Sequence, residues 1–128
     1  MVIDTSVLVA ILLREDGYED IVFRIAEADD RYLSAGSYLE ASIVLTRKRG
    51  KALEVELDRA IYEMDIVIVP VSVTHAKIGR EAYSIYGKGV SPAGLNLGDC
   101  FAYALSKSLG EPLLFRGNDF SKTDVAVA

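Results

Sequence analysis

The chain has 128 residues, of which 51% are hydrophobic, and its formal net charge is -5. This length suits one compact domain over residues 1–128 and leaves too little chain for a second domain. Cys100 is the only cysteine, which excludes an intrachain disulfide framework and a zinc site made of several thiolates. The chain has no signal-peptide pattern and no apolar run near the roughly 20 residues of a membrane span. We therefore expect a cytoplasmic protein with no membrane contact.

The apolar pattern predicts strands and helices that alternate along the chain. In the first half it predicts a strand over 1–4, helices over 5–14 and 17–28, a strand over 31–34, a turn at 36–37, and helices over about 38–49 and 52–64. In the second half it predicts a strand over 66–69, a helix over 73–86, an irregular segment over 87–98, a helix over 99–109 and a strand over 113–115, with 125–127 as a candidate edge strand. Such alternation favours an α/β sheet with helices on both faces.

The sequence also predicts where one strand, over 66–69, lies within the sheet. The run from Ile66 to Val69 is entirely apolar, and Pro70 stops it. A short continuous apolar run is typical of a strand buried on both faces of a parallel sheet, so we expect it near the centre of the sheet.

Four carboxylates stand at the junctions between these elements: Asp4, Glu40, Asp99 and Asp119. Each has an ordinary structural explanation. Asp4 can cap a helix, and Asp119 can be a turn residue. Glu40 and Asp99 each stand three residues after a capping side chain, Ser37 and Asn96 respectively, which is the spacing of a capping box.

Considered together, the four acids point to a metal site. In an α/β sheet the ends of the strands and the starts of the following helices meet in one crevice. Carboxylates about 5 Å apart repel by roughly 3 kcal/mol per pair at an effective dielectric near 20, and a divalent cation relieves this repulsion. Oxygen ligands without thiolates favour Mg²⁺ or Mn²⁺ over zinc.

Four segments carry a family resemblance: Val2–Ser6, Ser37–Ala41, Leu97–Ala102 and Phe115–Phe120. Their order and their acidic residues resemble the PIN domain, and more narrowly a VapC-type toxin, over essentially the whole chain. The resemblance implies a three-layer α/β fold with a central parallel sheet of four or five strands. It also implies a Mg²⁺- or Mn²⁺-dependent endoribonuclease that belongs to a VapBC-type toxin–antitoxin system and cleaves tRNA or ribosomal RNA.

The same resemblance assigns roles to residues. Asp4 and Asp99 become the main metal ligands, and Glu40 and Asp119 complete the acidic pocket directly or through water. Asp124 could share the role of Asp119 or be a solvated turn acid, and both readings stay open. The number of ions, one or two, also stays open.

Several neighbouring residues have both a functional and a structural reading. The hydroxyls of Thr5 and Ser6 can support Asp4, or belong to an ordinary first helical turn. Arg116 can steer a phosphate or be a solvated loop residue. The basic group Arg47 to Lys51 can offset the negative net charge toward RNA, although cations at a helix C-terminus also favour the helix dipole.

The expected reaction is hydrolysis by a metal-activated water, which leaves a 5′-phosphate and a 3′-hydroxyl. His75 is the only histidine, which excludes a two-histidine acid/base mechanism within one chain. The resemblance further implies a homodimer and a VapB-like antitoxin whose C-terminal segment occupies the groove. The alternatives are a non-catalytic PIN-like interaction module and an RNA-processing nuclease outside a toxin–antitoxin pair.

Overall fold

The computed structural model describes residues 1–128. The first half contains β1 (Val2–Ile3), α1 (Thr5–Leu12), α2 (Tyr18–Glu27), β2 (Tyr32–Ser34), α3 (Ala35–Arg49) and α4 (Ala52–Glu63). The second half contains β3 (Val67–Val69), α5 (Val73–Tyr86), α6 (Leu97–Leu109) and β4 (Leu113–Leu114). No helix combines the length and the apolar character needed to cross a membrane.

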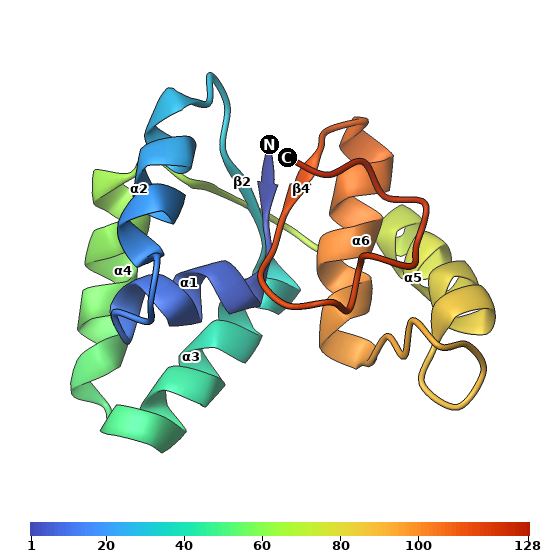
Figure 1. Cartoon of the computed structure of the whole chain (residues 1–128), viewed down its shortest axis with the longest axis horizontal. Coiled ribbons are helices and arrows are strands. Elements are labelled where there is room, and N and C mark those ends of the chain that lie inside the picture. Colours follow the sequence, from blue (N-terminus) through green and yellow to red (C-terminus); the bar gives the residue numbers. More distant parts are fainter.

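The four strands form one sheet in the order β3-β2-β1-β4, and every neighbouring pair is parallel. Helices α1 to α4 lie on one face and helices α5 and α6 on the other, so the molecule has three layers (Figure 1). The two termini lie close together at the end of the molecule where β1 begins (Figure 1). The predicted three-layer α/β sandwich is therefore confirmed, and of the four or five parallel strands expected the sheet has four.

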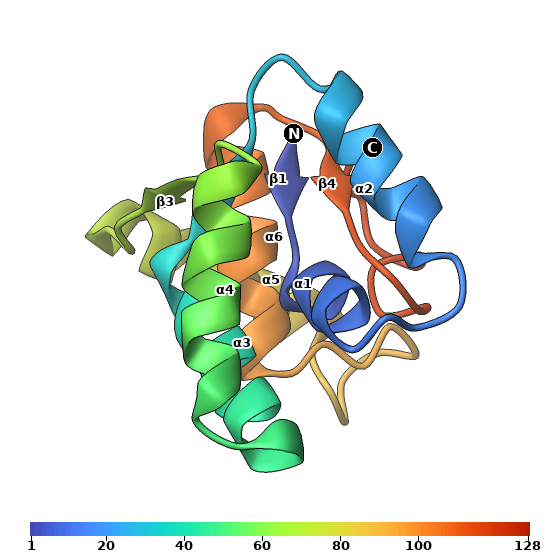
Figure 2. The same cartoon turned by 90° about the vertical axis from the view of Figure 1, so that its left-hand side faces the viewer.

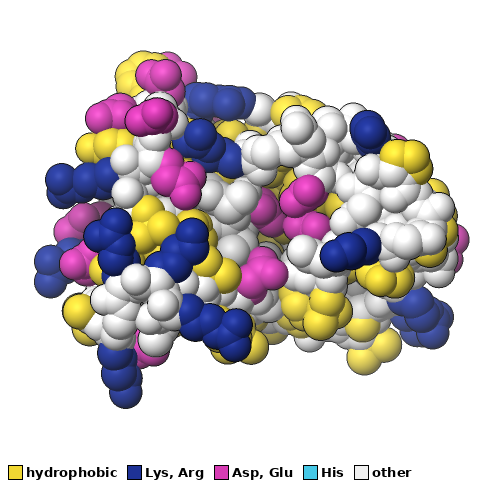
Figure 3. All heavy atoms as spheres, turned by 60° about the horizontal axis from the view of Figure 1, so that its bottom comes forward, with side chains coloured by type: hydrophobic (Ala, Val, Ile, Leu, Met, Phe, Trp, Pro, Cys, Tyr) yellow, Lys and Arg dark blue, Asp and Glu magenta, His cyan; other side chains and the backbone are white.

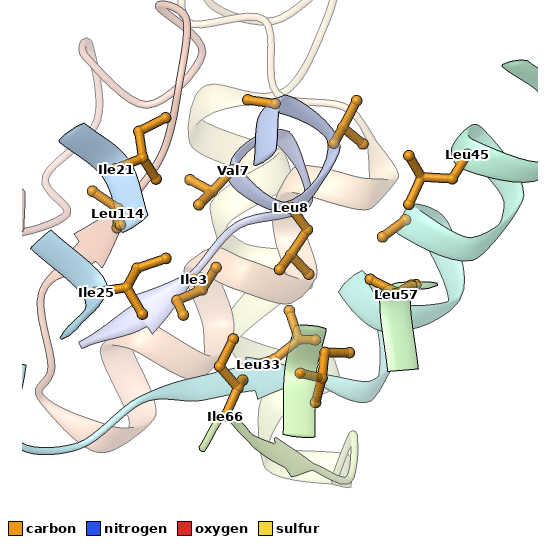
Figure 4. Packing of buried hydrophobic residues seen from close by; sticks show 14 of the residues in the cluster. Ile3, Val7, Leu8, Ile21, Ile25, Leu33, Leu45, Leu57, Ile66 and Leu114 are labelled. Atoms are coloured by element: carbon orange, nitrogen blue, oxygen red, sulfur yellow. The ribbon is translucent and has the colours of Figure 1, made fainter. Parts of the chain in front are cut away.

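Two apolar clusters fill the space between the layers. Side chains alternate between the two faces of a strand, so Ile3 and Leu114 point into the cluster under α1 to α4, while Val2 and Leu113 point into the cluster under α6. Figure 4 shows the first cluster, where Leu8 of α1 packs near Ile3. Because both faces are sealed, polar groups that follow the strands are directed to the ends of the sheet.

The predicted position of β3 is wrong. The strand lies at the edge of the sheet and pairs only with β2, and Figure 2 shows it well to the side of β1 and β4. Val67 is 55% exposed and Ile68 is 39% exposed, while Ile66, just before the strand, is buried. An apolar run is compatible with a buried strand, but strand order depends on pairing between distant segments, and here nothing pairs with the outer side of β3.

Helix α3 begins three residues earlier than predicted, so Gly36 and Ser37 are helical and the expected turn is absent. Ser34 caps the helix, because its hydroxyl accepts a hydrogen bond from the amide of Gly36 at 3.2 Å. The predicted capping box between Ser37 and Glu40 is therefore wrong, and Glu40 lies in the second turn. Gly36 suits this helix because a Cβ there would overlap the ring of Phe101.

Two smaller segments also differ from the prediction. Helix α6 begins two residues before Asp99, and the irregular segment preceding it contains one isolated parallel bridge, between Gly87 and Leu95. Residues 125–127 form no strand; they contribute only an isolated bridge between Val127 and Leu113. That bridge lays the end of the chain beside β4.

Candidate active site

Asp4 stands directly after β1 and caps α1. Its Oδ2 accepts hydrogen bonds from the amide of Ser6 at 3.0 Å and from the hydroxyl of Ser6 at 2.6 Å. Its Oδ1 is buried and has no hydrogen-bond partner in the protein. Asp4 is only 4% exposed, and this burial raises the pKa of its carboxyl group. The hydrogen bonds from Ser6 lower the pKa, and the charge of Glu40 raises it further. The prediction that Asp4 caps a helix is confirmed, and the cap uses only one of its two carboxylate oxygens, Oδ2.

Asp99 lies in the first turn of α6 and forms the predicted capping box with Asn96. Asp99 Oδ2 accepts the amide of Asn96 at 3.0 Å, and Asn96 Oδ1 accepts the amide of Asp99 at 3.1 Å. Burial raises the pKa of Asp99 to about 7, and the charges of Asp4, Asp119 and Glu40 raise it in the same direction. These three charges act on Asp99 because the fold brings all four predicted acids to one region of the molecule.

Glu40 reaches this region from α3, on the opposite side of the crevice from α6. Its carboxylate lies against the backbone of Gly98, where a side-chain Cβ would overlap it. Sequence reasoning missed Gly98 as part of the site. The available signal was a glycine inside the first turn of a helix, a position where glycine is unfavourable unless another group approaches closely.

The loop after β4 supplies Asp119 and is joined to the site by a hydrogen bond. The amide of Arg116 donates to the hydroxyl of Ser6 at 3.0 Å, and that hydroxyl in turn donates to Asp4. Ser6 thus connects the end of β1 with the loop that carries Asp119. The guanidinium of Arg116 donates to the carbonyl of Asp16 at 2.7 Å and so braces the turn between α1 and α2. Asp119 itself is exposed.

The other hydroxyl considered from the sequence, that of Thr5, serves the scaffold. It donates to the carbonyl of Ser37 at 3.1 Å and ties α1 to α3. Asp124 also has a structural partner: it accepts from the hydroxyl of Tyr103 at 2.6 Å and pairs with Lys107 at 3.0 Å. These bonds lower the pKa of Asp124, and they fasten the C-terminal segment to α6. Asp124 therefore has a structural role, and Asp119 stays the predicted fourth acid of the site.

The acidic region suits a cation on two grounds. The pKa of both Asp4 and Asp99 is raised, which means that their charged forms are disfavoured without a compensating charge. The unpartnered Oδ1 of Asp4 is a buried acceptor that a metal ion would satisfy. No three His, Cys, Asp or Glu side chains are arranged closely enough in this conformation to hold an ion between them. Binding would therefore require side-chain adjustment, which the half-buried Glu40 and the exposed Asp119 are free to make.

A groove of about 450 Å³ leads away from the acids along α3. It is lined by residues of α3 and of the start of α6, among them Glu40, Ile43, Val44, Leu97 and Gly98. Figure 3 shows this side of the molecule: Asp and Glu side chains lie in a central hollow, and Lys and Arg side chains gather on one side of it. Glu40 is thus accessible from the groove and Asp119 is exposed, while Asp4 and Asp99 are buried.

The family model of the PIN domain matches residues 1–126. The chain belongs to the PIN domain family. Ribonuclease VapC of Mycolicibacterium smegmatis is 47% identical over 126 residues, which cover 98% of this chain and 98% of that protein. Ribonuclease VapC28 of Mycobacterium tuberculosis is 46% identical over 126 residues, which cover 98% of this chain and 95% of that protein. Within the PIN family, the chain is therefore a VapC homologue over nearly its full length.

Solved structures agree with this family assignment at the level of the fold. VapC20 of Mycobacterium tuberculosis, a sarcin-ricin loop cleaving toxin, has a TM-score of 0.78 at 15% identity, over 99% of this chain and 97% of that one. A chain of a toxin–antitoxin complex from Klebsiella pneumoniae has a TM-score of 0.71 at 16% identity, over 99% of this chain and 95% of that one. The predicted PIN-like fold is thus confirmed.

Proposed function

We propose that this PIN domain is the ribonuclease toxin of a VapBC-type toxin–antitoxin pair and that it hydrolyses RNA phosphodiesters with Mg²⁺ or Mn²⁺. Its four acids would hold the ion: Asp4, Asp99, Glu40 and Asp119. One observation carries the metal part of the proposal. Asp4 Oδ1 is buried without a partner in a region where three other carboxylates gather, an arrangement that is costly unless a cation binds there.

The protein residues prepare this site in distinct ways. Ser6 and the amide of Asn96 each hold one oxygen of a buried carboxylate, which leaves the other oxygen of Asp4 and of Asp99 for the ion. Glu40 and Asp119 supply further negative charge at the rim. When bound, the ion would lower the pKa of an attacking water and neutralise charge on the scissile phosphate. The single histidine, His75, lies at the start of α5 and leaves no second imidazole for proton transfer.

The proposal is tested by incubating the purified protein with total RNA and defined tRNAs in Mg²⁺, Mn²⁺ or EDTA. We expect cleavage with either ion, none in EDTA, and products with a 5′-phosphate and a 3′-hydroxyl. Asp4→Asn and Asp99→Asn should each lower the rate by at least about 100-fold, the scale of a lost metal ligand or its support. Asp29→Asn, an exposed acid remote from the site, is the charge-matched control. Cleavage that survives EDTA would refute the metal mechanism.

We also propose two protein partners. A VapB-like antitoxin would bind over the acidic groove, in keeping with the toxin–antitoxin complex among the similar folds. A second copy of the chain would pair at the exposed apolar surface formed by β3 and the start of α5, where Val67, Ile68, Val71 and Val73 are 55%, 39%, 40% and 74% exposed. A cytoplasmic location follows from the proposed RNA substrate. If the protein binds a small partner but cleaves no RNA, the interaction-module alternative gains support.

A further inference from the structure

We propose that Arg47 binds a phosphate of the RNA strand beyond the scissile bond and so sets the direction in which the strand leaves the acids. This inference rests on the proposed ribonuclease function. Arg47 belongs to a basic group at the C-terminal end of α3, made of Arg47, Lys48, Arg49 and Lys51.

Helical geometry places Arg47 on the same face of α3 as Glu40. At about 100° per residue, seven residues turn a helix through about 700°, which is within roughly 20° of two full turns. The rise of 1.5 Å per residue separates the two positions by about 10 Å along the axis. Ile43 and Val44 lie between them on this face and line the groove. Arg47 therefore stands about one helical turn beyond Val44, the last residue of α3 that lines the groove, and on the same face as Glu40.

The state of the Arg47 side chain fits a role in binding. It is exposed, and it takes part in neither of the two ion pairs of the chain, which join Met1 to Glu111 and Lys107 to Asp124. Its five N–H donors are thus free for a planar, doubly hydrogen-bonded contact with a phosphate.

Charge complementarity decides in favour of RNA as the occupant. The groove has largely apolar walls and includes Glu40 of the acidic region, and the unpaired guanidinium of Arg47 lies about one helical turn beyond it along α3. An RNA strand is a polyanion, so its scissile phosphate can contact the metal at the acids while another phosphate contacts Arg47. Because the protein as a whole carries a net charge of -5, RNA must depend on such local basic groups.

The helix dipole alone would explain why cations lie at this end of α3. A comparison of Arg47 with Arg49 distinguishes this explanation from RNA binding. Arg49 is also exposed and also in the last turn of α3. It stands nine residues after Glu40, a rotation of about 180° that puts it on the opposite face. A helix-dipole role predicts equal behaviour for Arg47 and Arg49, whereas strand binding predicts that only Arg47 matters.

The test compares Arg47→Ala with Arg49→Ala by fluorescence anisotropy. The probe is a fluorescein-labelled, mixed-sequence RNA of 20 nucleotides, titrated in Mg²⁺ at several salt concentrations on an Asp99→Asn background that prevents cleavage. We expect Arg47→Ala to weaken binding about tenfold, as for one lost charge-assisted hydrogen-bond pair. It should also reduce the slope of log affinity against log salt by about 0.7, the value for one phosphate contact on a single strand. Arg49→Ala should change affinity by less than about twofold and leave the slope unchanged.

A second measurement uses the active enzyme. With the Asp99 carboxylate restored and Mn²⁺ present, Arg47→Ala should raise KM about tenfold and change kcat by less than about twofold, because Arg47 touches no reacting atom. Equal effects of the two variants, or an unchanged KM in Arg47→Ala, would overturn the inference. So would a loss of antitoxin binding without a loss of RNA binding. These failures differ from failure of the proposed function, in which the unmodified protein itself cleaves no RNA.

Discussion

Asp4 shows how one carboxylate can combine a structural task with the proposed metal binding. Its Oδ2 caps α1 through Ser6, and its Oδ1 stays buried and unpaired. Asp99 repeats the arrangement, since one of its oxygens completes a capping box with Asn96. Helix capping and metal binding, which compete as explanations when only the sequence is considered, are therefore compatible: the cap fixes the carboxyl group in place and leaves an oxygen available.

This arrangement predicts an unusual dependence of stability on pH in the metal-free protein. The pKa of Asp99 rises from 3.8 to about 7, and that of Asp4 is also raised. At pH values between about 4 and about 7, these carboxyl groups bind more protons in the folded state than in the unfolded state. The free energy of unfolding therefore falls as the pH rises through this range. In EDTA, we expect a higher melting temperature at pH 5 than at pH 8. Saturating Mg²⁺ should remove most of this difference.

Two variants check the assignment of this pH effect. Asp99→Asn removes the group that titrates, so in EDTA its melting temperature should fall less between pH 5 and pH 8 than that of the unmodified protein. Asp29→Asn, an exposed acid outside the site, should keep the full decrease. An unmodified protein whose melting temperature is the same at both pH values would contradict the burial of these carboxyl groups.

At the scale of elements, the contact between α3 and α6 determines the position of Glu40. These helices come from opposite layers and approach each other closely at two glycines. Gly36 of α3 receives the ring of Phe101, and Gly98 of α6 receives the carboxylate of Glu40. The close approach requires that positions 36 and 98 carry no side chain. A helical glycine signals such packing in the sequence, but it does not say which residue packs against it.

Gly98→Ala tests this contact. The added methyl group would overlap the Glu40 carboxylate and force it away from the other acids. We expect at least about a tenfold loss of ribonuclease activity and weaker Mn²⁺ binding, with little loss of stability because alanine favours the helix by about 1 kcal/mol. Gly79→Ala is the matched control: it is also helical, and its Cβ would meet nothing closer than 3.4 Å. Equal activity in the two variants would argue against a role for Glu40.

At the scale of the whole molecule, the parallel order of the strands brings the four predicted site residues to one end of the sheet. Because β1, β2 and β4 run in the same direction, the residues that follow them emerge at one end, where α6 also begins. The same topology leaves β3 at an edge with apolar side chains exposed. The predicted site residues thus come together within one chain, while the edge strand is open for association.

Light scattering after size exclusion tests the association of two chains at this edge. We expect a dimer, and we expect Val73→Asp to produce a monomer because it would place an unpaired charge in the apolar surface. Val73 is 74% exposed, so the substitution should not unfold the protein. Val55→Asp, at a 63% exposed position on α4, is the matched control and should stay dimeric. If both variants remain dimers, the contact lies elsewhere.

The sequence by itself determined the α/β class, most of the helices, and the places of Asp4 and Asp99 at the starts of helices. These features follow from local patterns: apolar periodicity, and capping residues a few positions from the groups they cap. Only the tertiary structure put β3 at the edge, set Gly36 of α3 against Phe101, fastened Asp124 to Tyr103 and set Glu40 against Gly98. Each of these depends on segments far apart in the chain, and such packing leaves little trace in local sequence.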